Sequence, residues 1–76
     1  MSKIRYTQHA FDVIVERKLA KELVESTVLF PEWEEKGSSE VWSAFKRVGK
    51  KVLRVVAKGK RAPFTVITAY YDRRRQ

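Results

Sequence analysis

The stretch from Val41 to Tyr71, VWSAFKRVGKKVLRVVAKGKRAPFTVITAYY, decides the fold of this chain. Three runs within it are rich in β-branched and aromatic residues, and turn residues separate each run from the next. Three consecutive strands with short links form an antiparallel meander, and the Gly49-Lys50 and Gly59-Lys60 pairs supply residues suited to its two hairpins. The strands are predicted at residues 41–48, 52–57 and 64–71.

The middle run alternates in a way that separates two faces of the sheet. Leu53, Val55 and Ala57 form one apolar row, and Arg54 belongs to the other row. We expect the apolar row to pack against a helical layer. Arg54 should then point to solvent from the uncovered face, because burying an unpaired charge is costly. In the two outer strands the alternation leaves open which row points inward, since a bulge would exchange the rows.

Upstream of the meander, apolar residues recur every three or four positions rather than every second position. This spacing is typical of helices. We predict a short strand over residues 4–6, a helix over residues 8–17 capped by Thr7, and a second helix over residues 20–30. Pro31 ends the second helix because proline disfavours the helical conformation of the preceding residue.

The acidic segment that follows, residues 32–39, is predicted to be a loop. The predicted order is therefore β-α-α-β-β-β, an α+β fold with two helices packed on one face of an antiparallel sheet. All 76 residues are expected to form a single domain. The chain has no cysteine and no apolar run near the ~20 residues of a membrane helix, so we expect a cytoplasmic protein without membrane contact.

Charge is distributed unevenly along the chain. Residues 41–76 carry a net charge of +10 and residues 31–40 a net charge of −3, within a total of +8. A field of this strength attracts polyanions, so nucleic acid is the leading expected partner, with an acidic protein partner or a merely solvated surface as the alternatives. The basic residues predicted to contact phosphates are Arg17, Arg47, Lys50, Lys51, Lys58, Lys60, Arg61, Arg73 and Arg74.

Metal catalysis lacks the residues that it needs. The chain has one histidine, no cysteine and a single acid after Glu40, so we predict no metal and no cofactor. The three glycines are too dispersed for a phosphate-binding loop. Metal-free cleavage of RNA stays open, because the ribose 2′-hydroxyl is then the nucleophile and the protein supplies only proton transfer and charge stabilisation.

The candidates for such catalysis are His9, Lys46, Arg54 and Tyr70. The two cations would hold the charge of the phosphorane, and His9 or a late tyrosine, Tyr70 or Tyr71, would move protons.

Several of these residues also have a structural interpretation. Tyr70 and Tyr71 are consecutive and point to opposite faces, so at least one of them is expected in the core. His9 would fix the entry of the first helix, and Arg54 would pair with an acid of the loop, Glu34, Glu35 or Glu40. Trp33 and Trp42 would stack on bases or belong to the core.

The pattern Thr7-x-His9-Ala10 opens the first helix, Arg17 closes it, the second helix runs into Phe30-Pro31-Glu32, and the last strand holds Val66-Ile67-Thr68-Ala69-Tyr70. This pattern resembles a family of small bacterial and archaeal domains of unknown function that is similar to the RelE/ParE-type toxins. In that family a glycine usually follows the arginine, where this chain has Lys18.

The resemblance implies a RelE/ParE toxin-like fold and a metal-independent endoribonuclease, an mRNA interferase of a toxin-antitoxin system. Its implied partners are RNA, free or on the ribosome, and an acidic antitoxin. It places the family's histidine and arginine on His9 and Arg17, and RelE-like basic and tyrosine positions on Lys46, Arg54 and Tyr70 or Tyr71. Two alternatives stay open: a non-catalytic nucleic-acid or ribosome-binding module, and a domain that binds an acidic protein partner. A weak homodimer is also expected, because a domain of this size is marginally stable alone.

Overall fold

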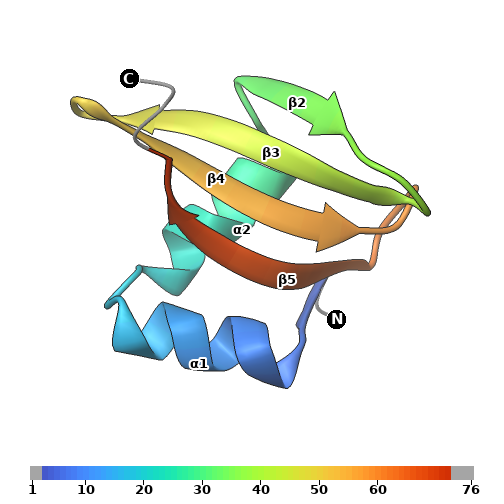
Figure 1. Ribbon diagram of the computed structural model, residues 1–76, viewed down its shortest axis with the longest axis horizontal. Helices are drawn as coiled ribbons and strands as arrows, with labels where there is room; N and C mark the ends of the chain where they lie inside the picture. The colour runs from blue at the N-terminus through green and yellow to red at the C-terminus, as the bar shows by residue number, and fades with distance from the viewer. Residues whose placement is uncertain (1–2, 73–76) are drawn as a thin grey trace.

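The computed structural model describes residues 3–72 and shows an α+β fold with two helices and a five-stranded sheet (Figure 1). In chain order the elements are β1 (Ile4–Tyr6), α1 (Gln8–Glu16), α2 (Lys21–Leu29), β2 (Trp33–Lys36), β3 (Val41–Val48), β4 (Lys51–Lys58) and β5 (Phe64–Tyr71). The α+β class, the opening strand, both helices and the meander agree with the sequence prediction. Among residues 3–72, neither helix is long and apolar enough to cross a membrane.

The sheet differs from the prediction in two ways. Its order is β1-β5-β4-β3-β2, and β1 pairs with β5 in parallel, so the sheet is mixed rather than antiparallel. The segment predicted as a loop at residues 32–39 contains β2, which forms one edge of the sheet. Glutamate and lysine have low β propensity, so the sequence Trp-Glu-Glu-Lys gives a weak strand signal. Pairing with β3 outweighs that weak propensity.

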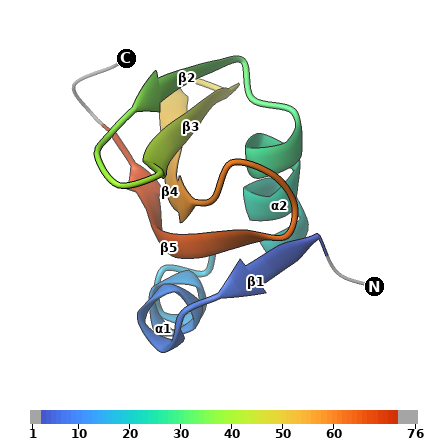
Figure 2. The same cartoon turned by 90° about the vertical axis from the view of Figure 1, so that its right-hand side faces the viewer.

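The core lies between the sheet and the helices. Leu53 and Val55 of β4 are fully buried there, as the alternation predicts, and they pack with Val24 of α2 and Ile14 of α1. Figure 2 shows α2 against β3 and β4, and α1 beside β5. The opposite side of the sheet, to which Arg54 points, is here called the open face.

A bulge in β5 decides which of its side chains face the core. Thr68 pairs with Val56, but Val66 pairs with Ala57, so Ile67 is the extra residue. The inward row therefore changes phase along the strand, and both Val66 and Ala69 are fully buried although they are three residues apart.

The first helix runs along the part of β5 that β1 leaves unpaired. The Thr7 hydroxyl caps α1 by accepting a hydrogen bond from the Ala10 amide at 3.0 Å, and it donates to the Ile67 carbonyl at 3.4 Å. At the other end of α1, the Arg17 guanidinium donates to the Ala69 carbonyl at 3.0 Å. Both ends of α1 thus satisfy edge carbonyls of β5.

A half-buried contact joins β1 to α2. The Tyr6 hydroxyl donates to the Glu25 carboxylate at 2.6 Å, and the Lys21 ammonium lies 5.2 Å from the centre of the tyrosine ring. Burial, together with the hydrogen bond to Glu25, holds the pKa of Tyr6 well above its usual range. The phenol therefore stays protonated, and its hydrogen bond fixes the edge strand to the helical layer.

The residue after the first helix adopts a left-handed backbone conformation. Lys18 has a φ of 55°, which a side chain disfavours and glycine tolerates. We expect Lys18→Gly to raise the free energy of unfolding by about 0.5–1 kcal/mol, because relief of this strain exceeds the added entropy of the unfolded chain. Urea denaturation measures the change. The control Glu16→Gly lies within α1 and should lower the stability by about the same amount; a Lys18→Gly variant that also loses stability would contradict the prediction.

Candidate functional site

Four side chains form a line across the open face, one from each of four neighbouring strands. The register places Trp33 of β2 opposite Phe45 of β3, Phe45 opposite Arg54 of β4, and Arg54 opposite Tyr70 of β5. Side chains at paired positions point to the same face of a sheet, so the four are direct neighbours. We call Trp33, Phe45, Arg54 and Tyr70 the aromatic-arginine row.

The members of the row stack on one another. The rings of Trp33 and Phe45 are 5.0 Å apart and nearly parallel, at 3°. The guanidinium carbon of Arg54 lies 5.4 Å from the centre of the Phe45 ring and 5.9 Å from that of Tyr70. Arg47 extends the row, with its guanidinium carbon 6.0 Å from the centre of the Trp33 ring. Phe45 has no exposed surface, whereas Trp33 and Tyr70 are half-buried and present part of their rings to solvent.

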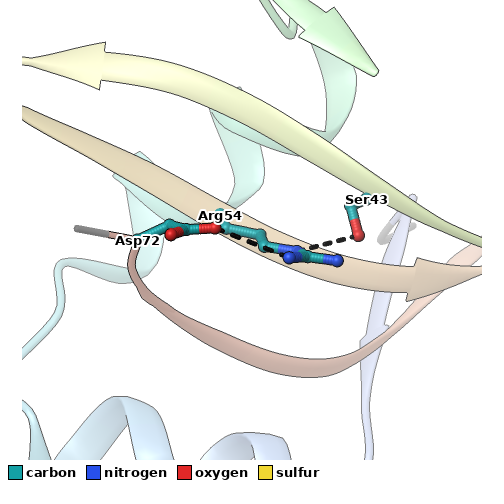
Figure 3. A network of polar contacts seen from close by, with 3 residues as sticks. All are labelled: Ser43, Arg54 and Asp72. Carbon is teal, nitrogen blue, oxygen red and sulfur yellow. Dashed lines mark hydrogen bonds and ion pairs between the residues drawn. The ribbon is translucent and has the colours of Figure 1, made fainter. Parts of the chain in front are cut away.

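Arg54 is held in the middle of the row by two polar contacts (Figure 3). Its Nε donates to the Ser43 hydroxyl at 3.1 Å, and an Nη atom lies 3.5 Å from a carboxylate oxygen of Asp72. The Arg54 side chain is 28% exposed and the Asp72 side chain 8%, so water reaches this ion pair mainly from the arginine and screens it only in part. A guanidinium has five N–H donors, so Arg54 can orient on these two partners and still donate to a ligand.

The partner of Arg54 corrects the sequence interpretation. The expected partners were the acids of the loop, Glu34, Glu35 or Glu40, but the ion pair forms with Asp72. The Asp72 amide donates to the Val52 carbonyl at 2.8 Å, which extends the pairing of β4 and β5 beyond the end of β5 and brings the carboxylate beside Arg54.

The structure does not bring the four predicted catalytic residues together. Arg54 and Tyr70 lie in the row, but Lys46 lies on the opposite face, where its ammonium donates to the Ser26 hydroxyl of α2 at 3.2 Å. Lys46 pairs with Leu53 of the core row, and this register fixes its face. His9 is exposed in the first turn of α1, which lies along the edge of the sheet beside β5. A joint action of Lys46 and Arg54 on one phosphate, as predicted, does not fit this arrangement.

The predicted phosphate-binding residues are also distributed over several surfaces. Arg47 and Lys58 belong to the open face. Lys51 lies on the helix side, with its ammonium 5.1 Å from the centre of the Tyr71 ring. Arg17 bonds to the backbone of β5, as described above. Of the others, Lys50, Lys60 and Arg61 lie outside the strands, between β3 and β4 or between β4 and β5, and Arg73 and Arg74 lie outside the described residues.

The open face is therefore less basic than predicted. It carries Arg5, Arg47, Arg54 and Lys58, but also the carboxylates of Glu35 and Asp72. Alternation along β3 and β4 sends every second residue to the helix side, which divides the cations of the meander between two faces. Within residues 3–72, no group of three or more histidine, cysteine, aspartate or glutamate side chains could hold a metal ion.

Sequence reasoning missed Asp72 and left Trp33 undecided between core and base stacking. Asp72 is the single acid after Glu40, and that isolation in a strongly cationic segment was an available signal. For Trp33 the signal was weak, because its strand is short and rich in glutamate.

Comparison with known protein families gives one finding. The profile of a family described as Domain of unknown function (DUF4258) matches residues 6–71, from the end of β1 to the end of β5. No curated protein and no solved structure matches the chain. The further likeness to RelE/ParE-type toxins stays a prediction.

Proposed function

Because the chain belongs to the DUF4258 family, whose function is unknown, we propose its function from the site: the protein binds single-stranded RNA across the open face of its sheet. The observation that carries this proposal is the aromatic-arginine row, in which Trp33 and Tyr70 flank Arg54. Aromatic rings on a sheet offer stacking surfaces to unpaired bases, and arginine side chains contact the phosphates between them.

The dimensions of the row suit a short single strand. Neighbouring strands of a sheet are ~4.8 Å apart, so a row across four strands spans about 14 Å, enough for two or three nucleotides. Trp33 and Tyr70 lie at its two ends. One face of the Trp33 ring stacks on Phe45, and Arg47 lies over the other face. Because the Arg47 side chain is exposed, it can move to a phosphate and leave this second face to a base.

A single strand fits this face better than a duplex. The bases of a duplex are stacked inside the helix, and proteins read them by inserting a helix, ribbon or loop into a groove. The row consists of buried and half-buried side chains on a sheet surface, and such side chains cannot reach into a groove. The net charge of +8 draws the polyanion to the protein from a distance.

Two consecutive residues on opposite faces provide the test. Arg47→Ala and Lys46→Ala each remove one positive charge, but only Arg47 belongs to the open face. Fluorescence anisotropy with a labelled single-stranded RNA should show weaker binding for Arg47→Ala and a shallower salt dependence, by about 0.7 in the log-log slope for one lost phosphate contact. Lys46→Ala should bind nearly as the wild type does. Equal losses of affinity in the two variants, or tighter binding to duplex RNA than to single-stranded RNA, would contradict the proposal. Comparison with single-stranded DNA of the same sequence measures how much the 2′-hydroxyl contributes to affinity.

A second candidate function is metal-independent cleavage of the bound RNA, as in the RelE/ParE-type toxins with their acidic antitoxins. The observation that favours it is the cluster of Asp72, Arg54 and Tyr70, which combines a carboxylate, a cation and a phenol. Asp72 would take the proton of a 2′-hydroxyl, whose oxygen bonds to the adjacent phosphorus. The bond from phosphorus to the 5′-oxygen would break, with Tyr70 protonating that oxygen, and a 2′,3′-cyclic phosphate and a 5′-hydroxyl would result.

The substitution Asp72→Asn separates the two candidates. It removes a negative charge beside Arg54 while keeping the shape of the side chain, so we expect RNA to bind roughly two- to fivefold more tightly. If the protein cleaves RNA, the same variant should lose cleavage, as followed on a gel in the presence of EDTA. Weaker binding by Asp72→Asn would show that Asp72 positions Arg54 for RNA, rather than competing with RNA for its guanidinium.

A further inference from the structure

A groove lies on the helix side of the sheet, between the end of α2 and the edge formed by β2 and the start of β3. Its volume is about 580 Å³. Val28 and Leu29 of α2, with Trp42 and Phe64 of the sheet, form an apolar lining. Trp42 is fixed in place, because its Nε1 donates to the Gly59 carbonyl at 3.0 Å and its ring meets Phe64 edge-on at 5.5 Å. The groove is thus a firm apolar depression, on the opposite side of the sheet from the aromatic-arginine row.

Charged side chains of both signs surround this lining. Glu34 and Lys36 project from β2, while Glu40 and Lys60 come from the connections before β3 and after β4. All four side chains are exposed, and their charges cancel. The surroundings of the groove are therefore neutral in a chain whose net charge is +8. A surface of mixed charge can face a copy of itself, whereas a uniformly cationic surface would repel its copy.

An exposed aromatic side chain lies next to the groove. Phe30 is 73% exposed, the highest value among the exposed large hydrophobic residues of the described chain. Its two neighbours in sequence, Leu29 and Pro31, both line the groove. An exposed apolar side chain and part of an apolar depression thus come from the same short stretch of chain.

We propose that this surface joins two copies of the chain about a two-fold axis, with Phe30 of each copy seated in the groove of the other. A two-fold contact requires a patch that complements itself, and an adjacent projection and depression meet this requirement. The acids and lysines around each groove then face their opposites in the other copy. Aromatic side chains buried near the centre of an interface contribute most of its binding energy, so Phe30 is the main anchor.

The proposed dimer leaves the open face free. The groove opens on the helix side, so RNA can reach the aromatic-arginine row in either copy, and the two proposals fail or hold separately. The other exposed large hydrophobic side chains within residues 3–72, Phe11 and Val15, lie on α1 and do not line the groove. They supply a matched control.

The first experiment measures the oligomeric state of the protein as a function of its concentration. Sedimentation velocity of the full chain from about 1 μM to about 1 mM should show a monomer-dimer equilibrium. Phe30→Ser should raise the dissociation constant about tenfold or more, whereas Phe30→Leu should retain much of the dimer and Phe11→Ser should leave it unchanged. Circular dichroism confirms that each variant is folded.

The second experiment tests the charges around the groove. The double variant Lys36→Glu with Lys60→Glu makes these surroundings wholly acidic, and Glu34→Lys with Glu40→Lys makes them wholly basic. Each should be monomeric alone, and an equimolar mixture should form a heterodimer. A wild type that stays monomeric at every concentration, a Phe30→Ser variant that dimerises as the wild type does, or a mixture that stays monomeric would overturn the inference.

Discussion

Replacing Trp33 by alanine should weaken the binding of single-stranded RNA about tenfold or more, since stacking of one base on an aromatic ring contributes ~1–3 kcal/mol. Trp33 is the outermost aromatic residue of the row, at the edge strand of the sheet, and its ring is parallel to that of Phe45. Trp33→Phe keeps a stacking surface and should retain most of the affinity. Anisotropy titrations at one fixed salt concentration measure the difference.

The control for this prediction is Phe11→Ala, which removes an exposed aromatic ring from α1. It should bind RNA as the wild type does. Trp33→Ala also loses packing on Phe45, so its thermal unfolding is followed to confirm that it is folded at the temperature of the titration. If folded Trp33→Ala binds as tightly as the wild type, the row is not a surface for bases, and the proposed RNA-binding function fails with it.

The largest effect on stability is expected from Phe45→Ala. Phe45 has no exposed surface although it lies on the open face, since Trp33 covers one side of its ring and Arg54 approaches it at 5.4 Å. Removing a buried phenylalanine costs about 3–5 kcal/mol, and a chain of this length has only about 4–11 kcal/mol of stability. The variant should therefore be close to unfolding at room temperature.

Urea denaturation of Phe45→Ala tests this expectation, with Phe45→Leu as a variant that keeps most of the buried volume and should lose much less. Phe11→Ala again serves as control, because a side chain that is 49% exposed contributes little. A loss below about 1 kcal/mol for Phe45→Ala would mean that the stacked row does not form in solution.

Local patterns were sufficient for most secondary structure. The rhythm of apolar residues predicts both helices, and Thr7 and Pro31 mark a helix start and a helix end because hydroxyl capping and the proline ring act within a few residues. Alternation in β4 placed Leu53 on the core side and Arg54 on the open face for the same reason, since neighbouring side chains of a strand point in opposite directions.

Contacts between residues far apart in the sequence could not be predicted from such local patterns. Strand β2 forms because Trp33 meets Phe45, and no local propensity shows that pairing. The bulge at Ile67 exchanges the rows of β5, and a bulge has no reliable local signal in this sequence. The expected cluster of Lys46 and Arg54 failed for a related reason, because the register of β3 against β4, and not residue type, assigns each side chain to a face.

The amino-acid sequence alone determined the α+β class, the positions of the helices and the meander, and the concentration of positive charge in the second half of the chain. These properties depend on residue type and on spacing over a few positions. Tertiary structure decided which side chains share a surface: it aligned Trp33, Phe45, Arg54 and Tyr70, placed Asp72 beside the arginine, and turned Lys46 toward α2. Such neighbourhoods depend on strand register, which hydrogen bonds and packing between segments far apart in the chain select together.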